Sequence, residues 1–293
     1  STIVILVSPA MLSSVICVWY LKWFRRNTRV ILWVQDLYEQ GLKETTTKIG
    51  FLSRGIIAVE NWLLNKSDKI VMAHPDFIKA KDVQGKDNRY SAIPNWSQFN
   101  YYPTASSEET RTFYKLDGSR VVLHIGNMGV KQGLEYVIEA AKLAANMRFV
   151  FVGGGNQLQK LQEHASNLGN ILFIPPVSEQ ELSNLLNAAD ILLVHENPGV
   201  KEMSIPSKLT TYFLSGKPVL VCSEKDSLAG ATVLGNETGF WVKSGDPSAL
   251  VSKIETLDLE QANRTAARAK DYAEKNLRKS EALEKFIKII VGG

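Results

Sequence analysis

Three loops of the sequence place glycine or lysine between the end of an apolar run and the start of a helical pattern. The first, "HIGNMGVKQGLEYVIEAA" (124–141), contains Gly126, Asn127, Gly129 and Lys131. Glycine lets backbone N–H groups approach a ligand and a helix N-terminus attracts anions, so this composition favours phosphate binding. A tight turn that needs its glycines for geometry alone explains the loop equally well.

The second loop, "FVGGG" (151–155), ends the next apolar run with Gly153, Gly154 and Gly155. It does not fit the dinucleotide pattern GxGxxG, because Leu158 stands at the third glycine position. The phosphate-binding pattern GxxxxGK followed by serine or threonine is absent from the chain. The sequence therefore supports neither a dinucleotide site nor a P-loop.

The third loop, "HENPGVKEMSIPSKL" (195–209), leads from the end of an apolar run into a helical pattern. Ser204 is the expected N-cap, with Pro206 and Ser207 in the first turn. Lys208 is unusual there, because a helix N-terminus favours carboxylates over cations. A bound anion would offset that cost, whereas a solvated lysine is the alternative. The three loops together predict a site for a nucleoside diphosphate.

The elements that must position these loops follow from the hydropathy pattern. Apolar runs alternate with helical patterns along most of the chain, which predicts an α/β fold with parallel sheets covered on both faces. A segment rich in turn residues and a polar segment follow residue 92, and we place a domain boundary near 105. The expected strands are Ile3–Val7, Val30–Val34, Lys69–Ala73, Val121–Ile125, Phe149–Val152, Ile171–Ile174, Ile191–Val194 and Pro218–Cys222.

Two helical patterns border these strands in the second part of the chain. Leu134, Val137, Ile138, Ala141 and Ala145 recur at helical spacing on one face. The helix after the third loop is expected to end at Gly216, with Pro218 just beyond it. From Leu257 onward the chain is helical and heavily charged.

Composition limits the classes of function. A chain of 293 residues is long enough for two domains with cores of their own. A hydrophobic share of 45% and a charged share of 22% are ordinary for a globular protein. The net charge is only +4, and no basic stretch interleaved with aromatics indicates nucleic-acid binding. Cys17 and Cys222 lack metal-ligand spacing, so we expect buried free thiols in a reducing cytoplasm.

The N-terminal segment allows three interpretations. Residues 3–21 carry no charge and approach the length of a membrane span, but Pro9 divides them into a strand-like and a helix-like run. The helix-like run ends in aromatic residues and cations: Lys22, Trp23, Phe24, Arg25 and Arg26. A helix on the inner face of the cytoplasmic membrane and a packed helix with solvated cations both fit, and a true span is the third alternative.

The motifs and their order resemble those of a retaining GT-B glycosyltransferase of family 4. The matching segments of the donor-binding part are "HIGNMGVKQGLEYVIEAA", "FVGGG", "NILFIPPVSEQELSNLLNAADILLV", "IPSKLTTYFLSGKPVLV" and "GNETGFWVKSGDPSAL". "ILWVQDLYEQ", "SDKIVMAHPDF" and "IPNWSQF" are similar to segments of the acceptor domain. The versions seen here are most similar to bacterial enzymes that build O-antigen, capsule and colanic-acid chains.

The resemblance implies two Rossmann-like domains with C-terminal helices. Residues 1–105 would form an acceptor-binding domain that lacks its first strands, so that the chain is an N-terminally truncated fragment. Residues 106–275 would bind the nucleotide sugar, and residues 276–293 would form a helix that packs back on the first domain. The implied reaction transfers a sugar from a nucleoside-diphosphate sugar, with UDP expected before GDP, to a lipid-linked glycan acceptor.

The resemblance also assigns roles to individual residues. The expected phosphate contacts are Gly126, Asn127, Gly129, Lys131, Ser207 and Lys208. The expected base and ribose contacts are Gly153, Gly154, Gly155, Pro176, Val177, Glu202 and Thr211. Many family members have a pair of glutamates where this chain has Met203 and Thr211, and Glu202 is the nearest substitute for the first. Asp36 and His195 are the candidate catalytic residues.

Asp36 would orient the acceptor hydroxyl or stabilise an oxocarbenium-like state, and a helix-capping aspartate is the alternative. His195 would bind the sugar or a phosphate, and an ordinary turn histidine is its alternative. No DxD triplet occurs, so we expect no metal and no cofactor besides the sugar nucleotide. A sugar-nucleotide epimerase of the same fold and a non-catalytic nucleotide-sugar binding subunit remain the competing interpretations.

Overall fold

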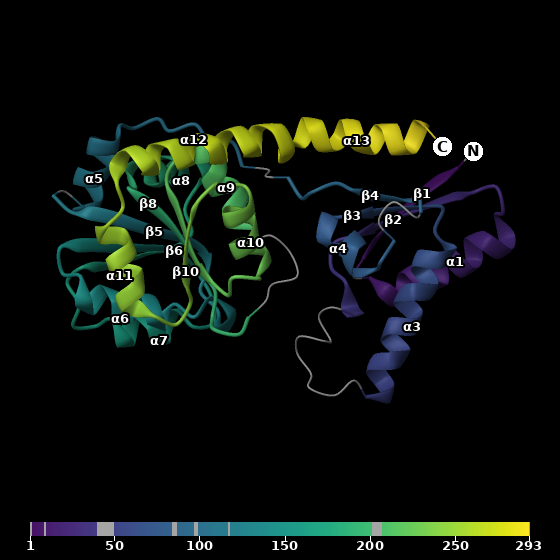
Figure 1. The fold of residues 1–293 in the computed structure, drawn as a ribbon, viewed down its shortest axis with the longest axis horizontal. Helices are drawn as coiled ribbons and strands as arrows, with labels where there is room; N and C mark the ends of the chain where they lie inside the picture. Colours follow the sequence, from purple (N-terminus) through teal and green to yellow (C-terminus); the bar gives the residue numbers. More distant parts are fainter. Residues whose placement is uncertain are drawn as a thin grey trace. The chain divides into compact units, whose positions relative to one another are not determined.

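A computed structural model describes residues 2–8, 10–39, 50–83, 87–96, 99–116, 118–200 and 207–292 of the chain. Its contacts divide the chain into two units (Figure 1). Unit 1 consists of Ser1–Trp96 together with Asn276–Gly293, and unit 2 consists of Ser97–Lys275. Residues 99–105, which the sequence interpretation assigned to the first domain, belong to unit 2.

Unit 1 contains a parallel sheet with the strand order β1-β2-β3-β4. The strands are β1 (Ile3–Ser8), β2 (Arg29–Val34), β3 (Lys69–Met72) and β4 (Tyr90–Ala92). The helices described around it are α1 (Met11–Phe24), α3 (Phe51–Lys66), α4 (Pro75–Ala80) and α13 (Lys279–Val291). Among the described residues, no helix has the length and apolarity needed to cross a membrane.

Helix α13, from the end of the chain, completes the core of unit 1. Phe286 of α13 packs edge-on against Trp33 of β2, with 4.8 Å between the ring centroids. The Arg29 guanidinium donates hydrogen bonds to the carbonyls of Ile289 and Ile290, at 3.3 and 3.1 Å. A cation at the carboxyl end of a helix satisfies carbonyls that have no partner within the helix. The sequence interpretation placed residues 276–293 against the first domain, and this helix lies in unit 1.

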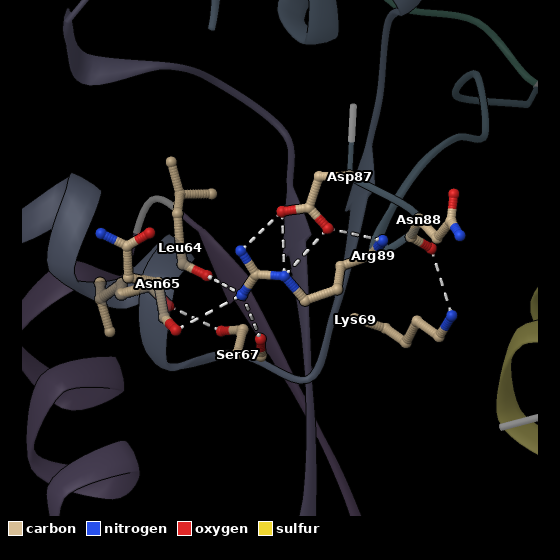
Figure 2. Close-up of polar contacts among 8 residues, drawn as sticks. Leu64, Asn65, Ser67, Lys69, Asp87, Asn88 and Arg89 are labelled. Atoms are coloured by element: carbon tan, nitrogen blue, oxygen red, sulfur yellow. Dashed lines mark hydrogen bonds and ion pairs between the residues drawn. The ribbon is translucent and has the colours of Figure 1, made fainter. Parts of the chain in front are cut away.

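A second arginine anchors β4 to the end of α3 (Figure 2). Arg89 donates through Nη1 to the carbonyls of Leu64, Asn65 and Ser67, at 3.1 to 3.4 Å. Its Nη2 also bonds the Asp87 carboxylate at 2.7 Å, and these hydrogen bonds hold the pKa of Asp87 below its usual value. The charged side chains of Arg89 and Asp87 therefore stabilise the fold.

Unit 2 contains a parallel sheet with the order β10-β9-β8-β5-β6-β7. Its strands are β5 (Arg120–Asn127), β6 (Met147–Gly154), β7 (Ile171–Ile174), β8 (Ile191–His195), β9 (Val219–Ser223) and β10 (Phe240–Lys243). Its helices are α5 (Ser107–Tyr114), the 3-10 helix η1 (Val130–Gln132), α6 (Glu135–Leu143), α7 (Leu158–His164), α8 (Glu179–Ala188), α9 (Ser207–Ser215), α10 (Leu228–Gly235), α11 (Pro247–Glu255) and α12 (Leu259–Asn276).

Charged side chains hold together the end of this sheet at which its strands begin, which we call the amino edge; the opposite end is the carboxyl edge. Asp190 accepts a hydrogen bond from the Val121 backbone N–H at 2.8 Å and pairs with Arg111 at 2.7 Å. Lys217 donates to the Asn187 carbonyl at 2.6 Å, and burial lowers the pKa of Lys217. Each of these bonds satisfies a backbone group or a charge at the start of a strand.

Each predicted strand overlaps an observed one, whereas β4 and β10 were not predicted. β4 has only three residues, too few to show a pattern, and β10 has four. Gly216 follows α9 with φ +67°, as expected of a helix end. Helix α6 stops at Leu143, so the placement of Ala145 on its buried face is wrong and Ala145 is exposed. Cys222 is buried, but Cys17 is only partly buried.

Candidate functional site

Strand β5 lies at the point where the strand order of unit 2 reverses. The chain proceeds from β5 to β6 and β7 on one side, and then to β8, β9 and β10 on the other. In open parallel sheets, a crevice for ligands forms outside the carboxyl ends of the strands at such a switch point. The three loops singled out in the sequence follow β5, β6 and β8, and they therefore lie at this edge.

Gly126 of β5 and Lys208 of α9 meet at the switch point. Gly126 has φ +114°, and a Cβ atom added there would lie 3.9 Å from the Cε atom of Lys208. The charge of Lys208 also contributes to lowering the pKa of two histidines, His124 and His195. The structure thus brings together two residues that are 82 positions apart in the sequence and were both predicted to bind phosphate.

The glycines at the end of β6 pack directly on the end of β5 and on the loop that follows it. Gly153 has φ +134°, and a Cβ atom there would lie 2.3 Å from the Gly126 carbonyl oxygen. Gly155 has φ +150°, and its Cβ would lie 2.5 Å from the Met128 carbonyl oxygen. Neither position accommodates a side chain. Gly154 differs, because a Cβ there would meet nothing within 4 Å.

Hydrogen bonds fix the rest of the first loop. The Gln132 side-chain oxygen accepts from the Gly129 N–H at 3.1 Å and from the Asn127 amide at 3.5 Å. The Lys131 carbonyl accepts from the Asn197 N–H at 2.7 Å, which connects this loop to the loop after β8. The side chains of Asn127 and Lys131 are exposed.

Other predicted site residues lie further from this cluster or outside what the structure describes. Pro176 and Val177 follow β7, beyond β6, with Pro176 exposed and Val177 partly buried. Thr211 lies in α9, partly buried. Ser207 is the first residue of α9, whereas Glu202 lies outside the described residues.

Asp36, the candidate catalytic carboxylate, follows β2 in unit 1. It is partly buried, and a carboxylate of α3 binds backbone N–H groups of the residues that follow it. Glu60 accepts hydrogen bonds from the N–H groups of Tyr38 and Glu39, at 2.7 and 3.4 Å. Lys81 in turn pairs with Glu60 at 3.0 Å. The segment that carries Asp36 is therefore anchored by a buried ion pair.

His195, at the end of β8, is buried with 3% of its surface exposed. Burial lowers the pKa of His195 to about 4, so the imidazole is neutral at neutral pH. Its Nδ1 lies 2.7 Å from the Gln132 carbonyl oxygen, and because a carbonyl only accepts, Nδ1 carries the proton. Nε2 therefore presents a lone pair, which can accept a hydrogen bond from a hydroxyl group but cannot donate one to a phosphate.

His124 is a residue that the sequence analysis did not single out. It lies within β5, fully buried, with Nδ1 3.2 Å from the Leu193 carbonyl oxygen. Burial, followed by the charge of Lys208, keeps the pKa of His124 well below its usual value. Within the described part of the chain its Nε2 has no hydrogen-bond partner. One histidine in the apolar run "VVLHI" was the signal available in the sequence.

The described residues contain no group of three or more histidine, cysteine or acidic residues arranged to hold a metal ion. The cluster at the switch point consists instead of glycine backbones, one lysine and two neutral histidines.

The model of the family "Glycosyl transferases group 1" matches residues 106–276. The chain belongs to this family. Among related group 1 glycosyl transferases is the putative colanic acid biosynthesis glycosyl transferase WcaI of Escherichia coli, 33% identical over 68% of this chain and 51% of the relative. The probable glycosyltransferase WbjE of Pseudomonas aeruginosa is 23% identical over 87% of this chain and 66% of the relative. The chain thus spans between half and two thirds of these relatives' length.

Solved structures share the fold of this group 1 glycosyl transferase. Anabaena Alr3699/HepE in complex with UDP superimposes with a TM-score of 0.78 at 17% identity, covering 99% of this chain and 79% of that chain. WaaG, a glycosyltransferase involved in lipopolysaccharide biosynthesis, gives a TM-score of 0.65 at 20% identity, covering 94% of this chain and 80% of that one. The fold class is α/β of the GT-B type, as predicted.

Proposed function

We propose that this protein transfers a sugar from a nucleoside-diphosphate sugar to a lipid-linked glycan acceptor, with retention, in the synthesis of a bacterial surface polysaccharide such as O-antigen or capsule. The observation that supports it best is the meeting of Gly126, Gly153 and Lys208 at the switch point of unit 2. Complexes of Alr3699/HepE with UDP and with UDP-glucose support a UDP-linked donor. The relative WcaI, which is named for colanic acid biosynthesis, supports the polysaccharide assignment.

The proposed chemistry separates the sugar from a diphosphate leaving group. The positive end of α9, the backbone N–H groups near Gly126 and the Lys208 ammonium would stabilise the charge that develops on the diphosphate, without a metal ion. The Nε2 lone pair of His195 would accept a hydrogen bond from a sugar hydroxyl. Asp36 would orient the acceptor hydroxyl, supported by the Glu60 and Lys81 pair behind its loop.

Lys208 provides the direct test of this site. Replacing Lys208 with alanine removes one charge-assisted contact to the diphosphate, so UDP binding should weaken by about 1–3 kcal/mol. Isothermal titration of the wild type and the variant with UDP, GDP and ADP measures this loss and identifies the base. Lys275→Ala, an exposed lysine of α12, is the matched control. Equal UDP affinity in wild type and Lys208→Ala would remove Lys208 from the site.

The acceptor side of the proposal places α1 on a membrane surface. The exposed stripe of α1 is apolar and aromatic: Leu12, Ile16, Trp19, Tyr20, Trp23 and Phe24. Trp and Tyr side chains favour the bilayer interface, and arginines attract anionic headgroups. Arg25 and Arg26 directly after α1 are exposed. Lys22, which was predicted to act with them, instead bonds both Asp68 oxygens at 2.9 Å and serves the fold.

Liposome sedimentation tests this assignment. Replacing Arg25 and Arg26 with alanine should reduce binding to vesicles that contain anionic lipid, by about 1 kcal/mol per arginine. Replacing Arg264 and Arg268 of α12, which are also exposed, controls for the loss of net charge. Identical sedimentation of the wild type and the Arg25/Arg26 variant would contradict the membrane assignment.

Product analysis separates transfer from the competing activities. Incubation with a UDP-sugar and a lipid-linked glycan should give an extended glycan and UDP. Release of UDP with free or epimerised sugar and no glycan extension would favour the epimerase. Binding without any turnover would favour a nucleotide-sugar binding subunit.

A further inference from the structure

The hydrogen-bond ladder between β5 and β8 stops before either strand ends. Strand β5 continues to Asn127 and β8 to His195, yet the paired positions are only Val122 with Ile191 and Leu123 with Leu192. On the other side of β5 the ladder with β6 runs without interruption to Asn127. The two strands on either side of the switch point therefore separate beyond Leu123.

The Tyr212 hydroxyl occupies the position of the next rung. Continuing the register of this pair would join the Ile125 N–H to the Leu193 carbonyl. Instead the Tyr212 oxygen accepts from the Ile125 N–H at 2.8 Å and donates to the Leu193 carbonyl oxygen at 3.4 Å. The hydroxyl thus stands between the two backbone groups and bonds each of them in place of one direct hydrogen bond. This keeps the strands apart while satisfying both backbone groups.

This bridge is buried and stays protonated. Tyr212 has none of its surface exposed, and burial raises the pKa of its hydroxyl. The Leu193 carbonyl also lies 3.2 Å from Nδ1 of His124, so the same oxygen accepts from two buried side chains at the gap. A carbonyl with two lone pairs can accept both bonds.

The bridge lies on the same face of α9 as Lys208. Tyr212 follows Lys208 by four residues, and residues four apart are neighbours on a helix surface. Lys208 lies over Gly126, the residue next to Ile125, whose N–H the Tyr212 hydroxyl binds. Two side chains of α9 therefore lie beside two adjacent residues of β5, with Tyr212 bonded to one of them, and this positions the first turns of the helix relative to the glycine loop.

We propose that Tyr212 is a positioning residue for the nucleoside diphosphate: its hydroxyl holds β5 and β8 apart at the switch point and sets Lys208 against the loop at Gly126. This inference rests on the proposed function. Without the hydroxyl, the Ile125 N–H and the Leu193 carbonyl can re-form the direct rung, which narrows the gap and displaces Lys208 from the diphosphate. The contribution falls mainly on the phosphates, because the contacts to the base and ribose that are predicted at the ends of β6 and β7 do not depend on α9. Thr211 is the predicted ribose contact that lies in α9 itself.

Tyr212→Phe, which keeps the ring and removes only the hydroxyl, tests the proposal. We expect the affinity for UDP to fall about tenfold, as for the loss of a charged hydrogen bond at Lys208, while uridine binding measured by NMR titration changes less than about twofold. In the Lys208→Ala background the same substitution should have almost no further effect on UDP, because the two residues act as one unit. Amide hydrogen exchange at Ile125, measured without ligand, shows whether the Ile125 N–H is still protected by a hydrogen bond in the variant.

Ser215→Ala is the matched control, since the Ser215 hydroxyl is buried at the other end of α9 and donates to the Tyr212 carbonyl at 2.6 Å. It should leave UDP affinity unchanged. Equal losses for UDP and uridine, or additive losses in the double variant, would overturn the positioning role. If the wild type binds UDP and the Tyr212→Phe variant binds it equally well, this inference alone is overturned. A wild-type chain that binds no nucleoside diphosphate overturns the proposed function as well.

Discussion

The two edges of the unit 2 sheet are built from different groups. At the amino edge, charged side chains bond backbone groups near the starts of the strands. Asp190 accepts from the Val121 N–H, and Lys217, which lies just before β9, donates to the Asn187 carbonyl in the last turn of α8. At the carboxyl edge, backbone lies against backbone: Gly153 packs on Gly126 without room for a side chain. At the amino edge charged side chains hold the strands, and at the carboxyl edge Lys208 lies beside glycine backbone.

This difference indicates which residues can change without loss of binding. An ion pair at the amino edge stabilises the fold but cannot be reached by a ligand at the opposite edge of the sheet. The glycines of the carboxyl edge serve both purposes, because they shape the crevice and are sterically required. Substitutions at the two edges should therefore separate stability from ligand affinity.

The largest effect is expected at Gly153. An alanine there would place its Cβ 2.3 Å from the Gly126 carbonyl oxygen at φ +134°, and unit 2 should lose about 3–5 kcal/mol of unfolding free energy. Gly154→Ala is the matched control, since nothing lies within 4 Å of its Cβ position. Urea unfolding of the two variants measures the difference. A stable Gly153→Ala protein would mean that the two glycine loops are not in close contact.

A pH-dependent effect of intermediate size is expected at His195. Its pKa is lowered to about 4 by burial, so the unfolded chain takes up a proton first as the pH falls. Stability is therefore full above the ordinary histidine pKa of about 6.5 and declines by about 3 kcal/mol as the pH falls towards 4.

His195→Asn keeps a donor for the Gln132 carbonyl and removes the titration, so its unfolding free energy should vary less between pH 7 and 4. His164→Asn, at an exposed histidine, is the control. An unchanged pH dependence in His195→Asn would indicate that His195 is accessible to protons in the folded state.

The smallest effect is expected at the amino edge. Asp190→Ala leaves the Val121 N–H and the Arg111 guanidinium without their carboxylate partner, which should cost about 1–3 kcal/mol of unfolding free energy. UDP affinity should remain within about twofold of wild type, because the substitution lies at the edge opposite the crevice. A marked loss of UDP affinity at unchanged stability would erase the distinction between the two edges.

Most of the unit 2 sheet could be predicted because its strands are largely buried apolar runs, and the glycines at the ends of β5 and β6 mark where these two stop. The apolar runs locate β5 and β6 in the sequence, and the glycines in "FVGGG" mark the end of β6. The strand order could not be predicted in the same way, because adjacency of β5 and β8 depends on long-range packing. That adjacency is what brings Lys208 to Gly126.

The parts of the site that were missed are those whose role depends on such adjacency. His124 and Tyr212 look like ordinary members of an apolar strand and an amphipathic helix, and only the interrupted ladder gives them a shared acceptor in the Leu193 carbonyl. The partner of Lys22 could not be predicted for a related reason. Its partner Asp68 is 46 residues away, so the letters around Lys22 could not indicate an ion pair.

The placement of α13 has a consequence for biosynthesis. The hydrogen bonds from Arg29 to the end of α13 join residues up to 261 positions apart, which is nearly the whole chain. During translation the surface of β2 around Trp33 therefore stays uncovered until Phe286 and the rest of α13 have been made. Unit 2 lies entirely between these two segments and can fold before unit 1 is complete, so shortening the chain at its carboxyl end would damage the unit made first.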